Sequence, residues 1–260
     1  MKRIFSAKYS NNISAVMLIS AILRKNISAV MLISAVCLAL SSCTKSSDDE
    51  IDSSNTGPLT VNISGVISHT SHTPGQSAMV TFSRFPANTA EFKKVCEQIG
   101  GEPHGAVALQ LMAYEMYRRN KKTGEECIRL NNVTTNVTPA LERLKELFSN
   151  DAYYARPYQI AAFLKGATPE NGYSPSKPYT VEIEVSAGIA YQYSNDYQAN
   201  VLYLRVLTKG KDKGAEEVAV LKTAKPGEPG NGINFIVFNS PGLYSQVKEI
   251  SFTSSFNGLD

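Results

Sequence analysis

The spacing of the apolar residues changes near Gly166, and this change limits the chain to folds that combine helices with strands. From Asn88 to Gly166 the apolar residues recur every three or four positions, which is typical of amphipathic helices. Beyond Gly166 they alternate with polar residues in five short runs without intervening helix, which indicates antiparallel strands. The sequence therefore predicts an α+β fold, in which an N-terminal cluster of about four helices precedes a mainly antiparallel five-stranded sheet or a small SH3-like barrel.

Two strand-like runs come before the helices. Residues 59–68 (LTVNISGVIS) and 78–85 (AMVTFSRF) flank a turn-rich segment, so we expect either a hairpin or a bridging pair of strands. A second turn-rich segment, residues 167–178 (ATPENGYSPSKP), separates the helical part from the β part. We therefore predict a mainly helical subdomain over residues 59–166 and a β subdomain over residues 167–260.

Several residues predict where helices begin. Asn88 is expected to cap the first helix, with Glu91 completing a capping box. Thr138 followed by Pro139 has the pattern of a later N-cap with proline in the first turn. Pro157 is expected to open another helix.

The run from Gly105 to Asn120 is apolar on every side, so we expect it to be the most buried helix. Glu115 interrupts this run and is a candidate catalytic acid. The simpler interpretation is an ion pair with Arg118 or Arg119, and we prefer it.

The first 42 residues have the pattern of a bacterial lipoprotein signal peptide with an internal duplication. Basic residues open the segment, and NISAVMLISA occurs at 12–21 and again at 26–35. The final apolar run is shorter than the about 20 residues of a membrane span and ends in Leu-Ser-Ser-Cys at 40–43. We therefore predict cleavage before Cys43 and attachment of lipid to Cys43, which would anchor the chain to a membrane.

Residues 43–58 are expected to form the lipid anchor and a flexible acidic tether, because they contain few apolar side chains. Thr44 stands where an inner-membrane retention signal would have aspartate, which favours the outer membrane. The acidic residues 48–50 resemble the surface-export signal of lipoproteins from Bacteroidota. We predict an outer-membrane lipoprotein exposed at the cell surface, with the periplasmic face as the alternative.

The charge of the chain argues against nucleic acid as a partner. Five of the 26 basic residues lie in the predicted signal peptide, which leaves 21 basic residues against 23 acidic ones. Nucleic-acid binding needs a concentrated positive surface, and no basic cluster is present in the sequence.

The sequence offers little for catalysis or metal binding. It has three histidines and no Gly-x-Ser-x-Gly motif. Cys127 and His104 are a conceivable nucleophile and base, but they match no familiar signature, and His69 and His72 lack a nearby acidic or cysteine ligand. We therefore predict no catalytic residue, no metal site and no cofactor. Cys96 and Cys127 are either buried thiols or a disulfide.

Tyrosines crowd the segment from residue 153 to residue 203. A tyrosine combines an apolar ring with a polar tip, which suits a surface that binds a peptide, a protein or a glycan. We select Tyr153, Tyr154, Tyr158 and Tyr173 as the candidate ligand surface, and we expect Tyr173 to be exposed in its connector. The alternative is that these rings line the core and the subdomain junction.

Three segments carry a resemblance to a known family: EPHGAVALQLMAYEMYRR at 102–119, GEECIRLNN at 124–132 and YYARPYQIAAFLKGATPENGY at 153–173. They resemble a family of uncharacterised lipoproteins from gut Bacteroidota. The resemblance implies membership and no activity, so it transfers no functional residue to this chain.

These observations predict a membrane-anchored envelope lipoprotein that acts as a binding or structural module at the cell surface. The alternative is a hydrolase of unrecognised type that acts on an envelope or dietary glycan or on a peptide. The lack of clustered histidines, cysteines or paired acids favours the first interpretation.

Overall fold

The fold is seen in a computed structural model, which describes residues 57–70, 72–187, 192–223 and 234–259. The predicted signal peptide, the predicted lipidation site Cys43 and most of the predicted tether lie outside the described residues. The described residues belong to one compact unit, and the finer boundary between residues 166 and 167 stays a prediction. Within the described ranges, no helix combines the length and the apolar character of a membrane span.

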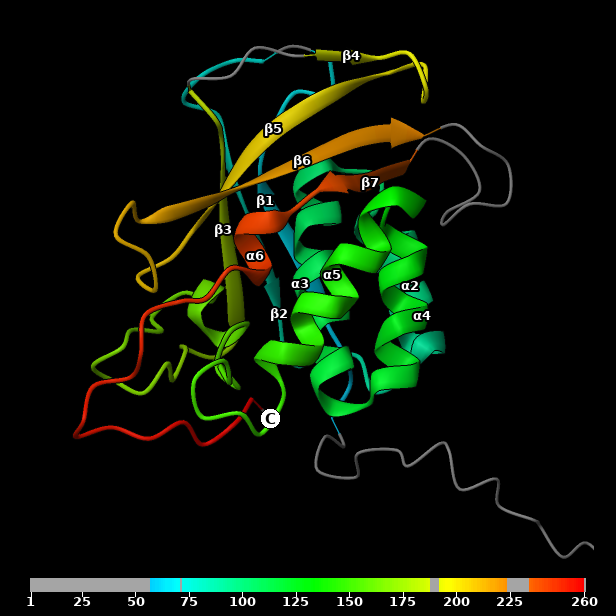
Figure 1. Cartoon of the computed structure of the whole chain (residues 1–260). Helices are drawn as coiled ribbons and strands as arrows, with labels where there is room; N and C mark the ends of the chain where they lie inside the picture. The colour runs from blue at the N-terminus through cyan, green and yellow to red at the C-terminus, as the bar shows by residue number, and fades with distance from the viewer. Residues whose placement is uncertain (1–56, 71, 188–191, 224–233, 260) are drawn as a thin grey trace, which may run out of the picture. The chain divides into compact units, whose positions relative to one another are not determined.

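Seven strands form one sheet (Figure 1). They are β1 (Val61–Gly65), β2 (Ser77–Phe82), β3 (Tyr179–Val185), β4 (Gln192–Ser194), β5 (Ala199–Leu207), β6 (Ala215–Thr223) and β7 (Asn234–Asn239). Their order is β1-β2-β3-β5-β6-β7, and β4 pairs with β5. Every neighbouring pair of these strands is antiparallel, as the sequence predicted.

The predicted α+β class is confirmed, but the predicted arrangement needs two corrections. The helices follow the first two strands instead of forming an N-terminal cluster, and the sheet has seven strands instead of five. The predicted hairpin β1–β2 is present, and it joins the later strands because the buried face of β2 matches that of β3. Val80 lies opposite Val181 and Phe82 lies opposite Tyr179, and all four side chains are buried.

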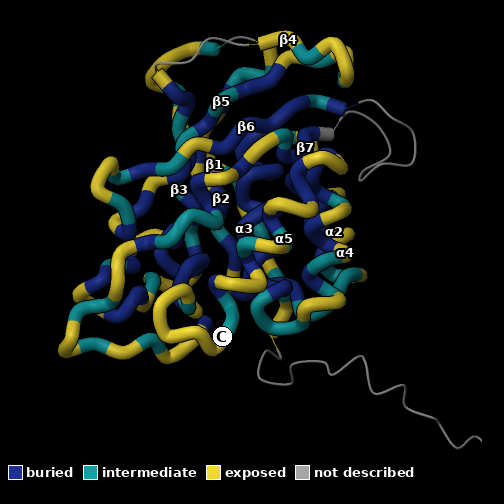
Figure 2. Tube along the Cα trace, in the orientation of Figure 1, coloured by how far each residue is buried: buried dark blue, intermediate teal, exposed yellow. Residues whose placement is uncertain are grey.

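The helices pack on one face of the sheet (Figure 1). They are α2 (Thr89–Ile99), α3 (Pro103–Arg119), α4 (Lys121–Asn131), α5 (Thr134–Leu147) and α6 (Pro241–Tyr244). A 3₁₀ helix, η1 (Ala161–Phe163), lies between α5 and β3 in the chain. Helix α3 contacts α2, α4 and α5 and also strands β2, β5, β6 and β7. Every residue from Pro103 to Tyr117 is buried, which confirms the predicted central helix (Figure 2).

The predicted start of α2 is confirmed. The Asn88 side chain accepts a hydrogen bond of 2.9 Å from the backbone N–H of Glu91, and the Glu91 carboxylate accepts one of 2.9 Å from the backbone N–H of Ala87. The first bond satisfies an N–H group that a helix start leaves without a partner. The second departs from the predicted capping box, because Glu91 accepts from the N–H of Ala87 and not from that of Asn88.

Two other predicted helix starts are wrong. Helix α5 begins at Thr134, so Pro139 lies inside the helix and not in its first turn. The segment that begins at Pro157 forms turns and the short helix η1 instead of a regular helix.

Candidate functional site

Two irregular segments, residues 148–176 and 245–259, pack together at the end of the molecule opposite β4 (Figure 1, green and red). The Arg156 guanidinium pairs with the Glu249 carboxylate at 2.8 Å. The Ser251 backbone N–H donates to the Pro169 carbonyl at 3.0 Å. We call these two segments the loop layer, and it holds all four tyrosines of the predicted ligand surface.

The four tyrosines form two pairs with opposite exposure. Tyr153 is 73% exposed and Tyr154 is 41% exposed, whereas Tyr158 is 6% exposed and Tyr173 is 0% exposed. The rings of Tyr153 and Tyr154 meet edge to face, with centroids 4.8 Å apart. The rings of Tyr158 and Tyr173 lie parallel, with centroids 5.1 Å apart. Only the first pair is therefore placed to meet a partner molecule.

The expected exposure of Tyr173 is wrong. The connector folds back on itself, because the Asn171 amide donates hydrogen bonds to the carbonyls of Gly166 and Ser174. This turn directs the Tyr173 ring inward, and its hydroxyl donates to the Lys248 carbonyl at 2.9 Å. Burial raises the pKa of Tyr173, as expected for a hydroxyl that leaves water.

Tyr153 and Tyr154 are held in place by contacts to their backbone and to the ring of Tyr154. The Asp151 carboxylate accepts hydrogen bonds from both backbone N–H groups, at 2.8 and 3.2 Å. The Arg143 guanidinium lies 5.7 Å from the centroid of the Tyr154 ring. The Gln246 amide donates to the Tyr153 carbonyl at 3.3 Å. These contacts leave the ring of Tyr153 free to bind an apolar surface and its hydroxyl free to form hydrogen bonds.

Sequence reasoning missed Phe252, a fully exposed aromatic side chain in the same loop layer. The run from Val247 to Phe252 (VKEISF) predicts a final strand, but the structure shows no strand there, and Phe252 lies in a turn. Phe256, four positions later, packs edge to face on Tyr158 with centroids 6.1 Å apart. In the sequence, the exposure of Phe252 was indicated only by the serine and threonine residues around it.

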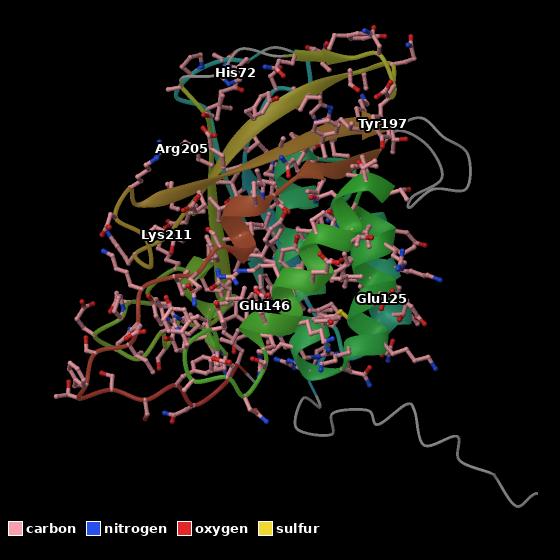
Figure 3. All side chains as sticks on the ribbon, in the orientation of Figure 1. His72, Glu125, Glu146, Tyr197, Arg205 and Lys211 are labelled. Carbon is pink, nitrogen blue, oxygen red and sulfur yellow. The ribbon has the colours of Figure 1, made fainter. Side chains whose placement is uncertain are left out.

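A polar cleft of about 300 Å³ lies elsewhere, between β5, β6 and α6. It is lined by Arg205, Lys213, Ala215, Glu216, Glu217, Pro241 and Gly242. Arg205 pairs with Glu184 at 2.8 Å, and Lys211, on the turn between β5 and β6, lies 3.5 Å from Glu216 (Figure 3). Because acidic and basic groups offset each other there, the cleft favours neither an anion nor a cation.

Cys127 and His104 do not form a nucleophile and base. Burial raises the pKa of the Cys127 thiol to about 12, which disfavours the reactive thiolate. Cys127 interacts with Thr89, whereas His104 interacts with Glu102 and His69. Among the described residues, no contact joins the thiol to the imidazole.

The remaining candidates from the sequence have structural partners. Glu115 is fully buried and pairs with Arg118 at 2.7 Å and with Arg119 at 2.9 Å, which confirms the ion-pair interpretation. His69 lies 2.8 Å from Glu102, an acidic partner that the sequence did not reveal. Cys96 and Cys127 are both free and buried. The described ranges contain no group of three or more histidine, cysteine or acidic side chains arranged to hold a metal ion.

Comparison with known proteins gives one match. A family model described as a domain of unknown function, DUF6935, matches residues 84–251. This range includes α2 to α6, strands β3 to β7 and the tyrosines of the loop layer. No curated protein and no solved structure matches the chain.

Proposed function

The chain belongs to the DUF6935 family, a domain of unknown function, and from its own residues we propose that it is a lipid-anchored envelope protein that binds a partner without catalysis. Its exposed pair Tyr153 and Tyr154 would be the contact surface. The single observation that carries this proposal is the fixed, solvent-facing geometry of these two rings. Large rigid aromatic side chains lose little conformational entropy when they bind, which makes them effective contact residues.

The anchor in this proposal is Cys43. Its support is the sequence Leu-Ser-Ser-Cys after a short apolar run and a basic start. Two or more acyl chains on one residue hold a protein on a membrane firmly, since each buried methylene contributes about 0.8 kcal/mol. The acidic residues 48–50 support an outer-membrane position facing the outside of the cell.

The anchor is tested by Cys43→Ala in the full chain. We expect the wild-type chain in the membrane fraction with acyl chains at Cys43 detectable by mass spectrometry, and the variant without acyl chains and with residues 1–42 still attached. Protease treatment of intact cells should remove the wild-type domain if it faces outward. A wild-type chain without acyl modification would refute the anchor, and protection until the outer membrane is broken would place the domain on the periplasmic face.

The contact surface is tested by hydroxyl-radical footprinting of intact cells and of the purified chain. We expect Tyr153 and Tyr154 to be less oxidised in cells than in the purified chain. Tyr193, which is 55% exposed on β4, is the internal control and should react equally in both. Equal oxidation of all three tyrosines in cells and in solution would refute the contact surface. No specific observation among the described residues favours the alternative of a hydrolase, so we do not propose it.

A further inference from the structure

We propose that the partner of the loop layer is the interfacial region of the lipid bilayer to which the chain is anchored. In this arrangement Phe252, Tyr153 and Tyr154 enter the headgroup region, and the domain lies with β4 directed away from the membrane. This inference depends on the lipid anchor of the proposed function. It names the partner of the aromatic surface and adds Phe252 to that surface.

The first step is that the predicted tether enters the domain at the end that carries the loop layer. The Arg84 guanidinium donates to the Gly57 carbonyl at 2.6 Å. The next residue, Phe85, packs under the Arg119 guanidinium at 5.3 Å. Arg119 in turn donates to the Leu259 carbonyl at 2.6 Å. Gly57 is thus connected through three residues to the final part of the loop layer.

The second step is the short reach of the predicted tether. Gly57 follows Cys43 by 14 positions, which can span at most about 50 Å even when fully extended. A chain lipidated at Cys43 is therefore confined close to the bilayer. Short linkers give effective concentrations of about a millimolar, so contacts that are weak for a free protein become populated.

The third step is the chemistry of the exposed side chains. Phe252 is fully exposed and has no polar atom, so it gains most from apolar surroundings. Tyr153 and Tyr154 combine an apolar ring with a hydroxyl, the combination that is enriched where hydrocarbon meets water in membranes. The bilayer interface uses both features together, since it offers apolar surroundings to the phenyl ring and hydrogen-bonding headgroups to the tyrosine hydroxyls.

The basic side chains of the loop layer are paired with acidic ones, and this pairing indicates which lipid headgroups the loop layer can contact. Arg156 pairs with Glu249, and Lys248 pairs with Asp212 at 2.8 Å. The surface therefore lacks the cluster of unpaired cations that binding to anionic lipids requires. We expect contact with zwitterionic headgroups, driven by the aromatic rings and insensitive to salt.

The absence of tryptophan from the sequence allows a direct test. The full lipidated chain carrying Phe252→Trp is placed in vesicles of phosphatidylcholine and phosphatidylethanolamine, with or without brominated acyl chains. We expect blue-shifted emission that the bromine atoms quench. The control Tyr193→Trp, on β4, should emit as in water and stay unquenched.

A second measurement uses unlipidated chains that lack residues 1–42, the predicted signal peptide, and carry Cys43→Ala. Adding Phe252→Ser should weaken their partition into the same vesicles by about tenfold, the factor expected from losing one buried phenyl ring. The fold should be unaffected, because Phe252 is fully exposed.

The outcomes separate this inference from the proposed function. If Phe252→Trp stays unquenched while the chain carries acyl groups and floats with the vesicles, membrane contact by the loop layer is refuted and the anchor stands. If the chain carries no acyl groups, the anchor itself is refuted. If a soluble peptide or glycan shifts the Phe252→Trp emission and vesicles do not, the partner is that ligand and the inference is overturned.

Discussion

The ring of Tyr173 stacks on the ring of Tyr158 with an angle of 14° between the two planes. Tyr173 holds this position with φ = 54°, a left-handed backbone conformation that is costly for a residue with a side chain. The stacking and the hydrogen bond to the Lys248 carbonyl offset that cost. Through the Lys248 carbonyl, the stacked pair joins the two segments of the loop layer.

Truncation of Tyr173 is expected to destabilise the domain. Tyr173→Ala removes a fully buried aromatic ring, which costs about 3 to 5 kcal/mol in the free energy of unfolding. Tyr173→Phe removes only the hydrogen bond to Lys248 and should cost about 1 kcal/mol. Urea unfolding measures both values. Tyr153→Ala is the exposed control and should change little; a Tyr173→Ala variant as stable as wild type would contradict the burial of this ring.

Much of the regular structure could be predicted from the sequence, because its elements bury one face. Phe92, Val95, Cys96 and Ile99 recur with the helical period, and all four are buried in α2. Alternation in the β3 run likewise predicted which side chains turn inward. The ion pairs of Glu115 could also be predicted, since three and four positions bring residues together on a helix.

The loop layer could not be predicted, because its contacts join residues far apart in the chain. Tyr173 is buried by Lys248 and its neighbours, which lie 75 positions away and share no periodic pattern with it. The connector around Tyr173 is rich in proline, glycine and serine, which is typical of an exposed loop. The prediction of an exposed Tyr173 relied on that composition and was therefore wrong. At the end of α4, the side-chain amides of Asn131 and Asn132 both donate to the Gln110 side chain across the core, a contact between segments about 20 positions apart.

The ion pairs of Glu115 are expected to contribute substantially to stability. Glu115→Ala leaves Arg118 and Arg119 without their buried carboxylate, a change that costs about 3 kcal/mol. The matched control is Glu125→Ala, which breaks an exposed pair with Arg129 on α4 and should cost less than about 1 kcal/mol (Figure 3). Denaturant unfolding of both variants measures the loss in the free energy of unfolding. Equal losses would show that the buried ion pairs of Glu115 stabilise the domain no more than the exposed pair of Glu125.

Cys96 and Cys127 are expected to be thiols that react only after unfolding. Burial raises the pKa of each thiol to about 12, so almost no thiolate is present at pH 8. In a chain with Cys37→Ala and Cys43→Ala, an aromatic disulfide reagent should detect little thiol in the native state and both thiols in denaturant. A chain that shows no thiol even when unfolded would instead contain the disulfide.

Because His104 is buried, we expect the domain to lose stability in acid. It is 1% exposed, and neither ring nitrogen has a hydrogen-bond partner. Burial lowers the pKa of His104 below its ordinary value of about 6.5, while Glu102 raises it and His69 lowers it further. The unfolded chain therefore takes up this proton at a higher pH than the folded chain. As the pH falls below about 6.5, the proton favours the unfolded state, and stability falls until the folded state also binds it.

The variant His104→Leu should remove this dependence on pH, because leucine fills the site without titrating. At pH 8 the variant should be as stable as wild type or slightly more stable, since no hydrogen bond of the imidazole is lost. Below about pH 6.5 wild type should lose stability faster than the variant. Urea unfolding between pH 8 and pH 4.5 measures both slopes. Parallel curves for wild type and His104→Leu would show that another group controls the response to acid.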